Sequence, residues 1–117
     1  MGNETLLKSI VESRPDITSA GIISRGKMAE IYGRPGVPMP PESDMKRMIL
    51  QTELLVGMIT TNERVVGDTR FIIISHADLS VVIVPVMKGK SLVVVFTAFR
   101  DIEGLTEKVL EQSKRIA

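Results

Sequence analysis

Three apolar runs in the second half of the chain constrain its fold more than any other feature. They read FIII, VVIVPV and LVVVF, and only short segments with turn-forming residues separate them. Runs that are continuously apolar, instead of alternating, are typical of strands whose two faces are both covered. Because the connections are short, we expect these strands to form an antiparallel meander. Their expected ranges are about 68–75, 79–86 and 91–97.

Pro85 lies inside the second of these runs and limits where that strand can be continuous. Proline has no backbone N–H, so it cannot donate a hydrogen bond in the middle of a sheet. We therefore expect Pro85 near the end of its strand or at a bulge.

The first third of the chain predicts a helix followed by a β-hairpin. Asn3 is a candidate N-cap for the helix, whose apolar residues fall on one narrow stripe. The apolar pattern then takes the period of strands, at about 20–24 and 27–32, with a turn at Arg25 and Gly26. Glycine supplies the positive φ that tight hairpin turns require.

Two further helices complete the expected order of elements. The segment GRPGVPMPP, at 33–41, is too rich in proline and glycine for a helix or a central strand, so we expect a stiff connector. A long helix follows at about 42–61 with Ser43 as candidate cap, and a last helix at about 102–116 with Asp101 as cap. The expected fold is α+β, an α/β sandwich in which helices cover both faces of a five-stranded antiparallel sheet, in the order α-β-β-α-β-β-β-α.

The long helix carries two apolar faces, and this is the main functional signal in the sequence. At about 100° per residue, one stripe has the spacing of an ordinary core face. It consists of Met45, Met48, Ile49, Thr52, Leu55, Val56 and Ile59. A second stripe on nearly the opposite side consists of Leu50, Leu54, Gly57, Met58 and Thr61, with Arg47 near it.

An apolar row on the outside of a helix is typical of an interface, and a mid-helix glycine such as Gly57 is typical of close approach by a neighbour. The alternative is that another element of the same chain covers the row. Self-association is the favoured interpretation.

Two glycine-containing fragments resemble parts of a phosphate-binding loop but lack its full pattern. GIISRGKM has Met28 where the magnesium-binding hydroxyl belongs, and GKS, at 89–91, has Val84 in place of the first glycine. Both are interpreted as hairpin turns. His76 is the only histidine and is interpreted as a turn residue, and no serine has the context of a catalytic nucleophile. We expect no enzyme activity, no metal site and no cofactor.

Composition limits the classes of partner. Aromatic residues make up 3% of the chain, and 15 basic against 14 acidic residues give a net charge of +1, so nucleic acid is not indicated. The chain has no cysteine, which excludes disulfides and thiolate sites, and its apolar runs are too short for insertion into a membrane. We expect a single cytoplasmic domain over residues 1–117.

Three stretches of the chain resemble the Roadblock family, the fold of dynein light chains and small-GTPase regulators, in its prokaryotic type. They are PDITSAGIISRGKMAEIYG, the long helix with two apolar faces, and the strand triplet that ends in LVVVF before the last helix. The resemblance runs from about residue 6 to residue 116. The chain departs from the family at its proline-rich connector, which is stiffer than the usual short acidic link.

The resemblance implies a homodimer in which the second helices lie side by side and the strands that follow them pair edge to edge. It thereby adds Phe71 and Ile73 to the candidate interface. It also implies a small Ras-like GTPase as partner, which the protein would regulate or scaffold without donating catalytic groups. The alternative is a structural dimerisation subunit of a larger motor or signalling assembly that has no GTPase partner.

Three arginines are candidates for an arginine finger, because such a residue can stabilise the transition state of GTP hydrolysis in a bound GTPase. Arg25 and Arg34 fall in predicted loops, and Arg47 lies near the outer face of the long helix. Solvation at the surface is the favoured interpretation of all three, since a finger is defined by geometry.

Overall fold

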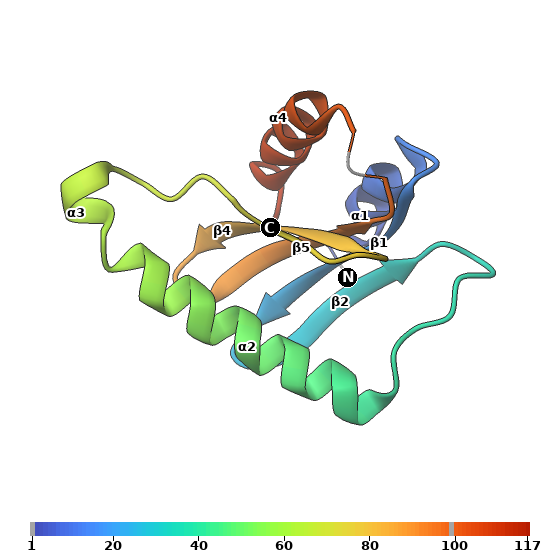
Figure 1. Cartoon of the computed structure of the whole chain (residues 1–117), viewed down its shortest axis with the longest axis horizontal. Helices are drawn as coiled ribbons and strands as arrows, with labels where there is room; N and C mark the ends of the chain where they lie inside the picture. The colour runs from blue at the N-terminus through green and yellow to red at the C-terminus, as the bar shows by residue number, and fades with distance from the viewer. Residues whose placement is uncertain (1, 99) are drawn as a thin grey trace.

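One five-stranded antiparallel sheet organises the computed structural model, which describes residues 2–98 and 100–117 (Figure 1). The strands are β1 (Ile17–Ser24), β2 (Lys27–Gly33), β3 (Ile72–Ser75), β4 (Ser80–Met87) and β5 (Lys90–Phe96). The helices are α1 (Glu4–Glu12), α2 (Glu42–Thr60), α3 (Glu63–Val66) and α4 (Ile102–Ser113). The strands lie in the order β2-β1-β5-β4-β3, so β2 and β3 form the two edges. The predicted α+β fold class is confirmed, and α3 is an addition to the predicted order.

The two faces of the sheet are covered unequally. α1 and α4 lie together on one face, and α2 alone crosses the other (Figure 1). The larger core cluster lies under α1 and α4, and it includes Leu7, Phe96 and Leu105, all almost completely buried. The smaller cluster lies under α2 around Ile49 and Ile83.

The three apolar runs form strands that differ in how completely they are buried. β4 and β5 are central, and most of their residues are buried on both faces, as the continuous runs predicted. Pro85 lies near the end of β4, where the register with β5 shifts, which confirms its expected position. β3 is an edge strand that begins at Ile72 instead of near residue 68, and its isoleucines are half-buried.

The hairpin turns and caps follow the sequence in most places. Arg25 and Gly26 both have positive φ, 53° and 78°, which is the geometry of a two-residue hairpin turn. The Asp101 carboxylate caps α4 by accepting from the N–H three residues on. Asn3 is the N-cap residue of α1, but its side chain makes no capping hydrogen bond. The prediction of Ser43 as a cap is wrong, because α2 begins before it and directly follows a proline whose φ of −54° already suits a helix start.

Arg34 fastens the start of the connector to the end of α1. Its guanidinium donates to the carbonyls of Val11 at 2.5 Å, Arg14 at 2.8 Å and Ile17 at 2.9 Å. Carbonyls in the last turn of a helix lack partners within the helix, so a charged donor is well placed there. The expectation that Arg34 is solvated at the surface is therefore wrong.

A second set of polar contacts, made by Arg14 and Asp16, links the start of β1 to the start of α4. The Arg14 guanidinium donates to both Asp16 carboxylate oxygens, at 2.9 and 2.7 Å, and also to the carbonyls of Arg100 and Asp101. The side chain of Asp16 is almost buried. The hydrogen bonds and positive charge of Arg14 lower the pKa of the Asp16 carboxyl, although burial opposes this shift.

Asp16→Asn tests the pH dependence of this pair. The folded pKa of Asp16 lies below its ordinary value of 3.8, so the stability it contributes is complete above that value and is lost as the pH falls through the folded pKa. We expect the variant to lower the free energy of unfolding by about 1–3 kcal/mol at neutral pH, because a hydrogen bond to a charged group is weakened. Urea unfolding at neutral and at strongly acidic pH measures the deficit, which should shrink in acid. Glu12→Gln, at an exposed carboxylate, is the control, and a deficit that stays constant with pH would contradict the assignment.

Arg34→Ala tests how much the hydrogen bonds of Arg34 stabilise the fold. The substitution leaves three carbonyls without their charged donor, and we expect a loss of about 2–4 kcal/mol in the free energy of unfolding. Arg47→Ala is the matched control, because Arg47 is exposed and, among the residues that the structure describes, pairs only with Asp44 on the same helix, at 2.9 Å. That control should change stability by less than about 0.5 kcal/mol. Equal urea midpoints for the two variants would show that the hydrogen bonds of Arg34 do not stabilise the fold.

Candidate interaction surface

α2 packs on its sheet face through a narrow stripe. Ile49 is the only residue of this helix that is buried among the described residues, and Met45, Leu55 and Val56 pack partly against the same cluster. Met48 was predicted in this stripe, but its side chain is 38% exposed. Successive residues of a helix point about 100° apart, so when Ile49 faces the sheet its neighbour Met48 points sideways.

The outer stripe of α2 lies in solvent within the described chain. Leu50, Leu54 and Met58 are 57%, 64% and 63% exposed, and Gly57 and Thr61 are exposed as well. The space beside Gly57 is open, since a Cβ added there would meet, apart from its chain neighbours and the nearby backbone of its own helix, no atom of the described residues within 4 Å. The alternative that another described element covers this row is therefore wrong.

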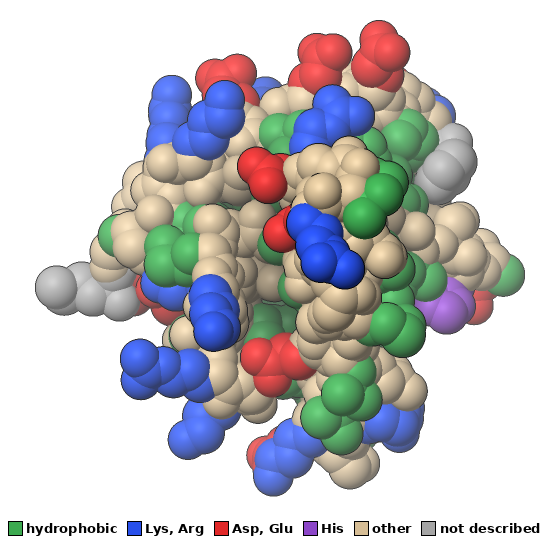
Figure 2. Space-filling view, turned by 90° about the vertical axis from the view of Figure 1, so that its left-hand side faces the viewer, with side chains coloured by type: hydrophobic (Ala, Val, Ile, Leu, Met, Phe, Trp, Pro, Cys, Tyr) green, Lys and Arg blue, Asp and Glu red, His purple; other side chains and the backbone are tan. Residues whose placement is uncertain are grey.

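α3 extends this apolar surface beyond the end of α2, and it was not predicted from the sequence. Its Val65 and Val66 are the most exposed large hydrophobic residues of the described chain, at 79% and 77%. Figure 1 shows α3 projecting from the body of the molecule, and Figure 2, seen from that side, shows hydrophobic side chains gathered on the surface there. A signal was present, because Asn62 and Gly67 bracket the helix with residues typical of its two ends.

The two edges of the sheet differ in their suitability for pairing with another strand. β3 pairs with β4 in regular register from Ile72 to Ser75, and its outer edge has no strand partner among the described residues. β2 carries a bulge, because Ile22 and Ile23 of β1 oppose Glu30 and Met28 and leave one residue of β2 unmatched. Bulges and charged residues protect edges from pairing, so β3 is the open edge.

The strand residues named from the resemblance lie beside this edge but turn toward the other face. Phe71, just before β3, and Ile73 are half-buried and pack against the core under α1 and α4, whereas Ile72 and Ile74 pack under α2. The Phe71 ring also lies 5.7 Å from the guanidinium of Arg70. Arg47 projects near the outer row of α2 and is exposed.

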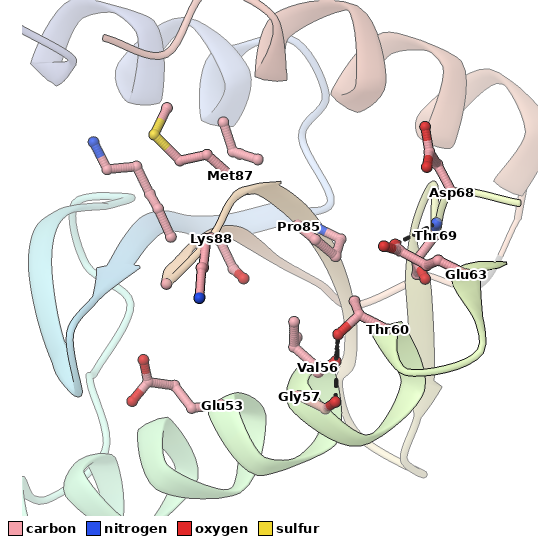
Figure 3. A pocket seen from close by; sticks show the side chains of 14 residues that line it. Glu53, Val56, Gly57, Thr60, Glu63, Asp68, Thr69, Pro85, Met87 and Lys88 are labelled. Carbon is pink, nitrogen blue, oxygen red and sulfur yellow. Dashed lines mark hydrogen bonds between the residues drawn. The ribbon is translucent and has the colours of Figure 1, made fainter.

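A hollow of about 670 Å³ separates the second half of α2 from the β4–β5 hairpin, and we call it the α2–hairpin hollow (Figure 3). Val56, Gly57 and Thr60 line it from α2, while Pro85 and Lys88 line it from the hairpin. The Thr60 hydroxyl donates back to carbonyls of its own helix.

Near the end of the same hollow, the Glu63 carboxylate accepts the N–H of Thr69 at 2.8 Å. The polar groups of the hollow thus serve the protein's own backbone in part. Among the described residues, no group of His, Asp or Glu side chains could hold a metal ion.

The phosphate-loop fragments are hairpin turns, as interpreted from the sequence. Gly26 and Gly89 have φ of 78° and 76°, and the N–H of Arg25 donates to the carbonyl of Gly89 at 3.2 Å, which joins the two turns. His76 lies in the turn between β3 and β4, where its N–H donates to the carbonyl of Leu79. No helix in the described part of the chain is long and apolar enough to cross a membrane.

No protein-family model and no curated protein matches the sequence. Solved structures do match over almost the whole chain. A Roadblock/LC7 domain from Streptomyces avermitilis is 18% identical, with a TM-score of 0.74 over 95% of this chain and 91% of that one.

Two structures of MglB are similar as well. The gliding protein mglB from Thermus thermophilus is 11% identical, with a TM-score of 0.77 over 95% of this chain and 82% of that one. An MglB with a tetrameric arrangement is 14% identical, with a TM-score of 0.73 over 97% of this chain and 85% of that one. These identities are low, but the element order, the sheet and the coverage agree, and the chain has the Roadblock/LC7 fold that its sequence resembles.

Proposed function

We propose that this chain is a non-catalytic homodimeric regulator or scaffold that binds a small Ras-like GTPase. The observation that carries the proposal is the combination of an exposed apolar row on α2 with the open edge of β3. A row of three exposed large hydrophobic residues is costly to leave in water, and an open, apolar strand edge invites a partner strand.

Self-association can satisfy both features at once. If β3 of one protomer pairs antiparallel with β3 of a second copy, a two-fold axis relates them and the same surface is used twice. The two α2 helices then lie on the same face of one continuous sheet. Leu50, Leu54 and Met58 face their counterparts, and Gly57 allows the helix backbones to approach.

The GTPase part of the proposal rests on the Roadblock resemblance together with the fold. A platform of two helices can bias a GTPase between two arrangements of its loops, provided that it binds one arrangement more tightly. In this arrangement the nucleotide stays on the partner. Arg34, whose guanidinium binds carbonyls at the end of α1, does not contact it, and neither do the hairpin turns of the phosphate-loop fragments. The alternative is a structural dimerisation subunit, and the exposed valines of α3 favour it, since they offer a further apolar contact for a larger assembly.

Leu54→Glu tests the interface. The variant places a carboxylate in the middle of the proposed helix pair, where an unpaired charge is costly to bury. Light scattering should report a dimer for the native chain and a monomer for the variant. Met87→Glu is the matched control, because Met87 is similarly exposed, at 53%, but lies on the β4–β5 hairpin. A native chain that is monomeric at tens of micromolar, or a control that dissociates equally, would contradict the interface.

Nucleotide dependence tests the partner. The Ras-like GTPases of the source organism, purified and loaded in turn with a non-hydrolysable GTP analogue or GDP, are titrated with the protein by calorimetry. We expect one of them to bind at least about tenfold more tightly in the GTP-analogue state, a difference of about 1.4 kcal/mol. Equal affinity for both states, or no binding to any of them, would favour the structural subunit.

Arg25→Ala and Arg47→Ala test whether the effect on hydrolysis is non-catalytic. Each variant should keep most of any stimulated GTP hydrolysis, because the proposal assigns stimulation to rearrangement of the GTPase. A loss of about a thousandfold in stimulated rate, with affinity unchanged, would identify an arginine finger and contradict the non-catalytic role.

A further inference from the structure

The connector between β2 and α2 ends in a short extended stretch whose conformation is fixed by proline. Residues 37–41 read Val-Pro-Met-Pro-Pro. Proline holds its own φ at about −65°, and it also disfavours the helical region for the residue before it. Every residue of this stretch is a proline or precedes one, so the backbone is restricted to extended and polyproline II conformations. Pro41, with φ of −54° and ψ of 151°, is close to polyproline II.

Both ends of the stretch are fixed to the body of the protein. A β-turn at 34–37 precedes it, closed by the N–H of Val37, which donates to the carbonyl of Arg34 at 3.1 Å. The guanidinium of Arg34 is itself bound to three carbonyls at the end of α1 and the start of β1. At the other end, the carbonyl of Pro41 accepts the N–H of Met45 in the first turn of α2, at 2.9 Å. The stretch therefore has little conformational freedom to lose when a partner binds.

The rings and carbonyls of the connector are not used by the fold. Its four prolines are exposed, Met39 is 43% exposed, and no described residue of 35–41 belongs to either core cluster. Within residues 2–98 and 100–117, no hydrogen bond reaches the carbonyls of 37–40. Figure 1 shows the connector as the cyan loop that stands out from the body between β2 and α2. The stretch thus presents apolar rings and free acceptors to solvent.

This combination is what an aromatic-lined groove recognises. A polyproline II helix has three residues per turn, so Pro38 and Pro41 lie on the same side, about 9 Å apart along the axis. Two such rings can pack between aromatic side chains of a groove. The N–H of a tryptophan or the hydroxyl of a tyrosine can donate to a free carbonyl between them. Val37 is half-buried, so the contact with a partner falls to the proline rings.

We propose that residues 37–41 are a docking segment for a partner protein that has an aromatic-lined groove of the kind that binds polyproline II helices. A second copy of the chain does not provide such a groove, since the chain has three phenylalanines, one tyrosine and no tryptophan. Nucleic acid and anionic membranes are disfavoured, because residues 35–41 carry no charge.

The docking segment shares no residue with the proposed dimer surface. It follows β2, which forms the edge of the sheet opposite to β3. The outer apolar row of α2 begins at Leu50, more than two turns into the helix. The proposal therefore stands or falls separately from the dimer and from the GTPase.

An NMR titration of the isotope-labelled full chain tests the proposal. The two probes are a purified Src-homology 3 domain and a purified WW domain, which both bind polyproline II segments through aromatic grooves. Prolines have no N–H, so the amides of Val37 and Met39 report on the stretch. We expect at least one probe to shift these two signals saturably, with a dissociation constant below about 1 mM.

Pro38→Ala with Pro41→Ala should weaken this binding by at least about fivefold, because it removes both rings and loosens the helix. Pro15→Ala with Pro35→Ala is the matched control and should change affinity by less than about twofold. Both control prolines are exposed and each lies in a turn outside the stretch, closed by the bonds from Ile17 to Arg14 and from Val37 to Arg34. The single variant Pro38→Ala should also weaken binding, and it covers the case in which the pair disturbs the start of α2.

Further arms separate groove recognition from other contacts. Replacing the groove tryptophan of the bound probe by alanine should abolish the shifts. The absence of a saturable shift with both probes, an equal loss in the control variant, or binding that survives the tryptophan replacement would each overturn the proposal. Shifts of the same two amides that appear when the concentration of the chain alone is raised would identify a second copy as the occupant, and would overturn it as well.

Discussion

A single helix has to cover one whole face of a five-stranded sheet, and much of the surface chemistry of this protein depends on that constraint. Five strands spaced about 4.8 Å apart span roughly 20 Å, whereas a helix with its side chains is about 10–12 Å across. α1 and α4 share the opposite face, and the core there is large and closed. α2 has its face alone, which leaves the hollow beside its second half and leaves Ile72 and Ile74 of β3 only half-buried beneath it.

The two edges of the sheet differ, and this difference limits how copies of the chain can assemble. If both edges were open, copies of the chain could add to one another without end. The bulge in β2 blocks one edge, while β3 keeps regular register with its neighbour and an open outer side. An edge that can pair only with its own counterpart closes after two copies, because the two-fold axis uses up both open edges. The proposed dimer is therefore consistent with the two edges of the sheet, and the bulge in β2 works against a fibre.

The sequence predicted the parts of the fold that follow from local patterns, and it did not predict those that depend on contacts between distant segments. The burial of β4 and β5 and the cap at Asp101 each follow from one elementary rule, and each was confirmed. The exposed row on α2 was equally predictable, because helical spacing assigns each residue a direction. Arg34, in contrast, has the sequence context of a loop arginine, and only the fold brings it to the carbonyl of Val11 in the last turn of α1 and to that of Arg14 just beyond the helix. The exposed valines of α3 lie in a helix too short to show periodicity, and the difference between the two edges required the strand register.

The two basic turns show how the same residue types can imitate one function and support another. A phosphate-binding loop needs glycine so that successive backbone amides can curl around an anion. In this chain, Gly26 and Gly89 serve the positive φ of tight hairpin turns, and the amide of Arg25 is already occupied by the neighbouring turn. One of the flanking cations is occupied as well, since the Lys90 ammonium donates to the carbonyl of Ala117 at 3.0 Å. The glycines of both fragments are therefore used for the geometry of hairpin turns, and not for curling the backbone around a phosphate.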